Sequence, residues 1–123
     1  MDIEQIRTYC LSQPLATEDS AFGNDVILFR IYHKIFACID LTRPDSVVMK
    51  CNPDYAVDLR DQYQGISGAW HWNKKYWNEV LLNADVPESL VLLLIDHSLR
   101  EVLHKLPKKI QKEYAVYLSS SAQ

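Results

Sequence analysis

The spacing of hydrophobic residues switches several times between a helical and a strand period along the chain. At the start, Ile6 and Cys10 lie on one helical stripe, and Asp2 with Gln5 three residues later forms a capping-box pattern. Pro14 ends this pattern, because proline disfavours the helical conformation in the residue before it. The first segment is therefore predicted to be a short amphipathic helix with one buried face.

Three runs with the two-residue period of a strand follow a polar connection over residues 15–25, where Phe22 is expected to pack down as an anchor. His33-Lys34 is the only polar break between the first two runs, so we expect a hairpin turn at these two residues. Such a short connection predicts antiparallel pairing. The three predicted strands span residues 26–32, 35–41 and 46–51.

The second half of the chain begins with a helix start at Asn52-Pro53, where asparagine caps the helix and proline takes its first position. This helix is predicted to end at Gly65. Strand character returns over residues 66–72 and again over residues 78–82, with a turn at residues 73–76 between them.

The most apolar helix is predicted next, and it should form the main cover of the sheet. Asp85 is expected to open it, and it should run to about Lys105. One more helical piece is expected over residues 108–118, and residues 119–123 are expected to fray. The whole chain up to residue 118 is thus interpreted as one domain.

The order of predicted elements is α-β-β-β-α-β-β-α. Strands joined by hairpins and covered by helices on one face indicate an α+β two-layer sandwich. We expect an antiparallel sheet of about five strands in this fold.

Composition restricts the class of protein. The chain has 123 residues, of which 48% are hydrophobic, and this suits one globular domain. Sixteen acidic against thirteen basic residues give a net charge of -3, which argues against a protein whose whole surface binds nucleic acid. The first 61 residues carry a balance of -4 and the remainder a balance of +1. Any site for a polyanion is therefore expected in the second half.

Cys10, Cys38 and Cys51 are an odd number of cysteines without a C-x-x-C pair, and each lies in an apolar stretch. We interpret them as reduced, buried residues rather than as disulfides or zinc ligands. The N-terminus lacks the basic start and apolar core of a secretion signal. The longest apolar run, over residues 90–95, is too short to span a membrane, so we expect a cytoplasmic protein.

Residues 69–80 combine aromatic surface, positive charge and amide donors as no other segment does. In a strand, Trp70 and Trp72 would share a face and His71 would point the other way. Lysines neutralise phosphates and aromatic faces stack on bases, so such a turn can touch nucleic acid as a wing. The alternative is that the tryptophans belong to the core and Lys74-Lys75 is an ordinary solvated turn.

A second group of lysines follows the most apolar helix. The dipole and solubility both favour lysine at a helix C-terminus, so a solvated helix end explains this group without any ligand. If the group lies beside the wing, it extends a basic stripe. Its members are Lys105, Lys108, Lys109 and Lys112.

Asp96-His97-Ser98 has the residue types of a catalytic triad, but three consecutive helical residues point in three directions and cannot share one proton path. His97 and His104 lie on one helical face without a third metal ligand at a suitable spacing. We therefore expect no enzyme, no cofactor and no metal site.

The segment His71-x-Asn73-Lys74-Lys75-x-Trp77-Asn78 resembles a motif of the YjbR/MmcQ family of small bacterial proteins. The resemblance covers roughly residues 1–110, and it implies a CyaY-like, or frataxin-like, α+β fold. It also implies DNA binding through a double-wing motif. The other matching stretches are Tyr9-Cys10-Leu11 with Pro14, Phe22-Gly23, Phe36-Ala37, Val48-Met49-Lys50-Cys51 with Pro53, Pro87, Asp96-His97-Ser98 and Leu106-Pro107.

Carried onto this sequence, the resemblance places the two wings at His33-Lys34 and Asn73–Lys75. The frataxin-like fold also implies an iron chaperone as an alternative. Frataxins bind iron through an acidic ridge on the first helix, where this chain offers only Asp2 and Glu4, so this alternative does not carry over. The candidate DNA contacts are His33, Lys34, Lys50, His71, Asn73, Lys74 and Lys75, with Trp70, Trp72 and Trp77 as structural anchors.

Two hypotheses of different classes follow. The first is a monomeric module that binds double-stranded DNA through these wings. The alternative is a protein-interaction or small-ligand module without catalysis, in which the Trp/His/Asn segment forms the site.

Overall fold

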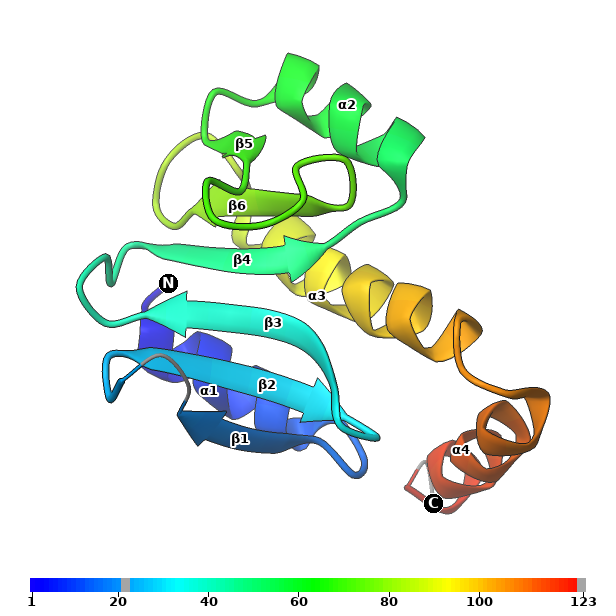
Figure 1. Ribbon diagram of the computed structural model, residues 1–123. Helices are drawn as coiled ribbons and strands as arrows, with labels where there is room; N and C mark the ends of the chain where they lie inside the picture. The colour runs from blue at the N-terminus through cyan, green and yellow to red at the C-terminus, as the bar shows by residue number, and fades with distance from the viewer. Residues whose placement is uncertain (21–22, 122–123) are drawn as a thin grey trace.

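The computed structural model describes residues 1–20 and 23–121, and the predicted anchor Phe22 lies outside them (Figure 1). Within the described residues the chain forms four helices and six strands. They are α1 (Ile3–Ser12), β1 (Thr17–Ser20), β2 (Val26–Ile31), β3 (Lys34–Asp40), β4 (Ser46–Lys50), α2 (Pro53–Gln62), β5 (Ile66–Gly68), β6 (Trp77–Leu81), α3 (Glu88–His104) and α4 (Lys108–Ser121).

The six strands form one antiparallel sheet in the order β1-β2-β3-β4-β6-β5, which confirms the α+β class. The prediction of about five strands did not include β1, so the count is corrected to six. Strand β1 is polar and has no hydrophobic alternation that would indicate a strand from the sequence. Charged side chains hold this edge strand instead. Glu18 pairs with Arg7 of α1, and Asp19 pairs with Arg30 of β2 at 2.8 Å.

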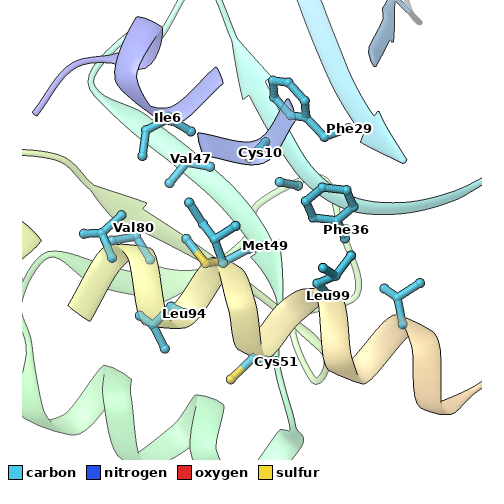
Figure 2. Packing of buried hydrophobic residues seen from close by; sticks show 14 of the residues in the cluster. Ile6, Cys10, Phe29, Phe36, Val47, Met49, Cys51, Val80, Leu94 and Leu99 are labelled. Carbon is cyan, nitrogen blue, oxygen red and sulfur yellow. The ribbon is translucent and has the colours of Figure 1, made fainter. Parts of the chain in front are cut away.

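Helices α1 and α3 lie on one face of the sheet, with α2 beside β5, so in the described part of the chain the opposite face of the sheet is free of helices (Figure 1). The hydrophobic core fills the space between these helices and the strands. Figure 2 shows Ile6 and Cys10 of α1 with Leu94 and Leu99 of α3 around Met49 in this layer. All three cysteines are buried with free thiols.

The hairpin between β2 and β3 turns at Tyr32-His33 and not at His33-Lys34, because Ile31 pairs directly with Lys34. Tyr32 and His33 have φ of 46° and 69°, as a primed two-residue turn requires. The Tyr32 ring contacts the Tyr114 ring edge-on at 6.2 Å, and this contact joins α4 to the hairpin.

A bulge in the β2–β3 pairing turns two consecutive side chains of β3 toward the helices. The register shifts between Phe29 and Arg30, and Phe36 and Ala37 both belong to the core. Beyond the Ala37–Met49 pair, β3 separates from β4. This separation is visible as the bend of β3 near its start (Figure 1).

Asp85 does not cap α3 as predicted. Its carboxylate accepts hydrogen bonds from the backbone N–H groups of Gln64 and Gly65, each at 2.7 Å, and so fixes the start of β5. These bonds hold the pKa of Asp85 below its usual value, with the Gly65 bond as the largest cause. A Cβ at Gly65 would lie 2.8 Å from Asp85 Oδ1, so a larger residue there would have to displace that carboxylate.

The last two helices, of 17 and 14 residues, are shorter than the roughly 20 residues that a membrane span needs. Helix α3 ends at His104, and α4 continues to Ser121, three residues beyond the predicted end at residue 118. Within the described residues, no helix has the length and hydropathy required to cross a membrane.

Candidate functional site

The segment between β5 and β6 is a loop and not the predicted strand over residues 66–72. Strand β5 ends at Gly68, and Trp70 and Trp72 lie in the loop that follows. The Asn73 carbonyl accepts hydrogen bonds from the N–H groups of Tyr76 and Trp77, each at 3.0 Å, which closes one helical turn before β6. Aromatic residues favour strands, but local hydrogen bonding determines the conformation here.

Asn73 and Arg60 fix the shape of this loop. Asn73 Oδ1 accepts from the Lys75 N–H at 3.0 Å, so the predicted DNA contact Asn73 has a structural role as a turn residue. Arg60 of α2 donates to the Lys74 carbonyl at 3.0 Å, and Lys74 packs against Gly68, where a Cβ would lie 3.1 Å from that side chain. The loop is therefore tied to α2 and β5.

The three tryptophans have different environments. Trp77 begins β6, and its ring packs on the Trp72 ring with centroids 4.5 Å apart, which suits the predicted anchoring role of both. Trp70, the third predicted structural anchor, is 71% exposed and does not belong to the buried core. The loop carries Trp70 away from the core, because it leaves the strand geometry at Ala69.

Four lysines from distant parts of the chain lie at one end of the sheet, and two of them contact the Tyr76 ring. Figure 1 shows β4 ending on the side where β3 begins and α3 ends. Lys75 Nζ lies 5.4 Å and Lys105 Nζ 5.8 Å from the centroid of the Tyr76 ring. We call Lys34, Lys50, Lys75 and Lys105 the lysine cluster.

Lys50 is subject to the charges of two other members of the lysine cluster. Its side chain is half-buried, and burial is the largest cause that lowers its pKa. The charges of Lys105 and Lys34 lower the pKa further, while Glu101 acts in the opposite direction. Two like charges act on Lys50 and the carboxylate of Glu101 opposes them, so an additional anion at the cluster would be favourable.

The remaining predicted contacts are exposed but lie elsewhere or serve other roles. His33 is in the β2–β3 turn, where its carbonyl accepts from Arg30 at 2.9 Å. Lys74 Nζ lies 5.4 Å from the centroid of the Trp70 ring, and the His71 ring meets the Trp70 ring edge-on at 6.1 Å. Lys74 and Lys75 therefore contact different aromatic rings of the loop.

A cavity of about 600 Å³ lies on the helix-free face of the sheet, bordered by Trp70, His71 and Trp72 of the loop. Its floor follows a row of paired residues across three strands, in which Cys38 pairs with Val48 and Val48 pairs with Glu79. Val47 and Met49 belong to the helix side of β4, so Val48 between them faces the cavity. Its other lining residues are Val26, Ile35, Asp40 and Arg43.

Charged groups of the cavity come from β3, β6 and the β3–β4 turn. Arg43 donates to Glu79 at 3.0 Å, and the Ser46 hydroxyl donates to the second oxygen of Glu79 at 3.1 Å. Asp40 accepts from the N–H and the hydroxyl of Thr42, and both bonds use Oδ1. These bonds are the main cause that lowers the pKa of Asp40, and the nearby charges of Arg43 and His71 add to them.

Asp96, His97 and Ser98 bind three different parts of the molecule, as expected for consecutive helical residues. Asp96 accepts from the Tyr9 hydroxyl of α1 at 2.7 Å, and His97 Nε2 accepts from the Asn52 N–H before α2 at 3.1 Å. Ser98 accepts from the Lys50 N–H at 2.8 Å. The three residues fasten α3 to its neighbours rather than forming a catalytic site.

Metal ligands were also not expected from the sequence. Among residues 1–20 and 23–121, no group of three or more histidine, cysteine, aspartate or glutamate side chains is arranged to hold a metal ion.

Lys105 was expected to extend the basic stripe only if its group of lysines lay beside the wing, and the charged residues of the cavity were not foreseen. Lys105 belonged to a separate group of lysines in the sequence, and only the tertiary fold brings it to Tyr76. Tyr76 lies inside the motif, so an aromatic residue next to two lysines was a usable signal. Asp40, Arg43 and Glu79 are isolated charges whose convergence depends on strand pairing.

Comparisons with known proteins agree with the architecture. The family model described as YjbR matches residues 11–101. The chain is 26% identical over 113 residues to the uncharacterised protein YjbR of Escherichia coli strain K12, covering 91% of this chain and 96% of the relative. The names of the relatives assign them no catalytic activity.

Solved structures give the same result. A crystal structure of the Deinococcus radiodurans protein DR2400, which has a DUF419 domain, is similar with a TM-score of 0.85 and 28% identity over 92% of this chain and 87% of that one. A crystal structure of a Pseudomonas syringae protein is similar with a TM-score of 0.69 and 25% identity over 80% of this chain and 96% of that one. With the family match over most of its length, the chain belongs to the YjbR family.

Proposed function

We propose that the protein binds double-stranded DNA through the phosphates, using the lysine cluster as its contact surface. The observation that carries the proposal is that Lys75 and Lys105 contact the Tyr76 ring from two separate segments. The charges of Lys105 and Lys34 also act on Lys50, which adds two further segments to the same end of the sheet. Lysines grouped on one face neutralise phosphates without reading the base sequence. The loop before β6 and the hairpin turn before β3 then act as the two wings.

The overall charge sets the strength of this interaction. A net charge of -3 opposes approach to DNA, so only the local positive end of the sheet favours it. Binding is therefore weak and depends steeply on salt. If all four lysines contact phosphates, the logarithm of the association constant falls with the logarithm of salt concentration with a slope of about -3 to -4.

Fluorescence anisotropy with a labelled random duplex at several salt concentrations tests the proposal. The neighbouring residues Lys74 and Lys75 provide a matched pair, because only Lys75 contacts Tyr76. Lys75→Gln is expected to weaken binding and to make the salt slope shallower by about 1. Lys74→Gln, which removes the same charge from the same loop, is expected to have the smaller effect.

Two results would contradict DNA binding by the lysine cluster. One is the absence of binding to any duplex at low salt. The other is an equal effect of Lys74→Gln and Lys75→Gln, since the proposal depends on the position of the charge and not only on its sign.

The small-ligand alternative has a separate basis in the structure. The cavity beneath Trp70 lies beside the same loop, but its lining includes no member of the lysine cluster.

A further inference from the structure

The cavity on the helix-free face of the sheet has the features of a binding site for a small amphipathic molecule. Its volume of about 600 Å³ falls in the range that accommodates a drug-sized ligand. Valine, isoleucine and cysteine side chains provide an apolar floor, and the indoles of Trp70 and Trp72 provide a wall. Apolar linings with a few polar groups at defined positions are typical of such sites.

The charges of the cavity favour a cationic group on that molecule. Apart from the imidazole of His71 and the thiol of Cys38, the ionisable groups are two carboxylates and one guanidinium, which leaves a net charge of -1. The guanidinium of Arg43 is already paired with Glu79. The carboxylate of Asp40 therefore provides the negative charge that has no basic partner in direct contact.

Asp40 has an oxygen available for a ligand. Thr42 donates both of its hydrogen bonds to Oδ1 of Asp40. In the part of the chain that the structure describes, no group donates a hydrogen bond to Oδ2 or forms an ion pair with this carboxylate. An ammonium group could take that position at the cost of no existing contact.

The tryptophan wall adds attraction for the same charge. Indole faces attract cations through their quadrupole, and tryptophan is the strongest side chain in this respect. One cation already uses this property, because Lys74 Nζ lies 5.4 Å from the centroid of the Trp70 ring. Trp70 is 71% exposed at the edge of the cavity, an unfavourable placement for so large an apolar side chain unless it contacts another molecule.

We propose that this cavity binds a small organic cation, an ammonium group carrying an apolar substituent, with the charge at Asp40 and the apolar part against Trp70 and the floor of the sheet. The proposal goes beyond DNA binding and does not depend on it, because Asp40 is not part of the lysine cluster and lies among the residues of a different surface.

Three probes of similar size separate charge from shape. They are phenethylammonium, the neutral 2-phenylethanol and the anionic 3-phenylpropionate, each titrated into the full chain at about pH 8. Binding is followed by tryptophan fluorescence and by amide resonances in two-dimensional NMR. Phenethylammonium is expected to bind at least about fivefold more tightly than the alcohol, and the carboxylate most weakly.

Two variants assign the effect to its residues. Asp40→Asn keeps an oxygen for the Thr42 hydrogen bonds but removes the charge, so the cation should lose its preference over the alcohol. Trp70→Ala removes an exposed ring and should weaken phenethylammonium by about fivefold or more. Asp61→Asn, at an exposed position of α2 outside the cavity, is the matched control and should change nothing.

The proposal is overturned if the alcohol or the carboxylate binds as tightly as the cation, or if none of the three binds. It is also overturned if Asp40→Asn leaves the preference for the cation intact. Should Asp40→Asn fail to fold, Trp70→Ala and the ranking of the three probes still decide the outcome. DNA binding, measured in parallel on Asp40→Asn, should not be weakened.

Discussion

Ser98 bridges the two central strands where their own pairing stops, and its hydroxyl is expected to contribute strongly to stability. The side chain is fully buried, accepts from the Lys50 N–H at 2.8 Å and donates to the Phe36 carbonyl. Ser98→Ala removes both bonds and leaves two backbone groups without this partner. Since each buried unsatisfied group costs about 1 to 3 kcal/mol, the free energy of unfolding should fall by about 3 kcal/mol.

Urea unfolding followed by tryptophan fluorescence measures this loss. With an m-value of about 2 kcal/mol/M, the midpoint should fall by about 1.5 M urea. Ser89→Ala, at an exposed position in the first turn of α3, is the control and should stay within about 0.5 kcal/mol of the unmodified chain.

The bridging role of Ser98 is refuted if Ser98→Ala costs less than about 1 kcal/mol, the net value of one ordinary hydrogen bond. The Lys50 amide resonance gives an independent readout, because its hydrogen bond ends on the Ser98 hydroxyl. It should shift and exchange faster with solvent in Ser98→Ala. An unchanged Lys50 amide would show that β4 does not depend on this contact.

Two further predictions concern pH and backbone space. Burial is the main cause that lowers the pKa of His97, whose Nε2 accepts from the Asn52 N–H. The unfolded chain therefore takes up this proton first as the pH falls below about 6.5, and stability should decline from there toward the lower pKa of the folded state. Urea midpoints at pH 7.5 and 5.5 should differ less in His97→Gln than in the unmodified chain, and an equal difference would contradict this assignment. Gly65→Ala should destabilise by about 1 to 3 kcal/mol, because the new Cβ meets the Asp85 carboxylate. In an Asp85→Ala background the cost should be smaller, and an unchanged cost in this double-mutant cycle would disprove the clash.

Local signals in the sequence were sufficient to predict several elements. Asp2 and Gln5 form the expected capping box of α1, and Asn52 caps α2 with Pro53 at its start. These predictions succeed because a cap depends on residues three or four apart in the chain. The alternating runs of β2, β3 and β4 were found for the same reason, since each depends only on a local period.

Elements that depend on partners distant in sequence were missed or misplaced. Strand β1 is polar throughout, and it forms because Glu18 and Asp19 meet arginines of α1 and β2. Asp85 stands before α3 like a cap, yet it binds the backbone at Gly65. In both cases the deciding contact joins two segments whose proximity the hydrophobic pattern does not encode.

The candidate site was foreseen as one segment, but its residues serve two surfaces. Lys75 contacts Tyr76 together with Lys105, whereas Lys74 contacts Trp70 at the border of the cavity. In an extended strand, the neighbours Lys74 and Lys75 would also point to opposite faces of the sheet. Trp70 and Trp72 would share one face of such a strand, whereas here they lie in a loop. The helical turn closed on Asn73 is what separates the two lysines here.

This separation means that the loop before β6 borders both proposed ligand sites. An anion at the lysine cluster would contact Lys75, and a cation in the cavity would place its apolar part against Trp70, the ring that Lys74 contacts, within one tied loop. Arg60 holds the loop at the Lys74 carbonyl, between the two contacts. Any coupling between the sites must therefore pass through a segment whose backbone is fixed by α2, and the sites should act independently unless that hydrogen bond breaks.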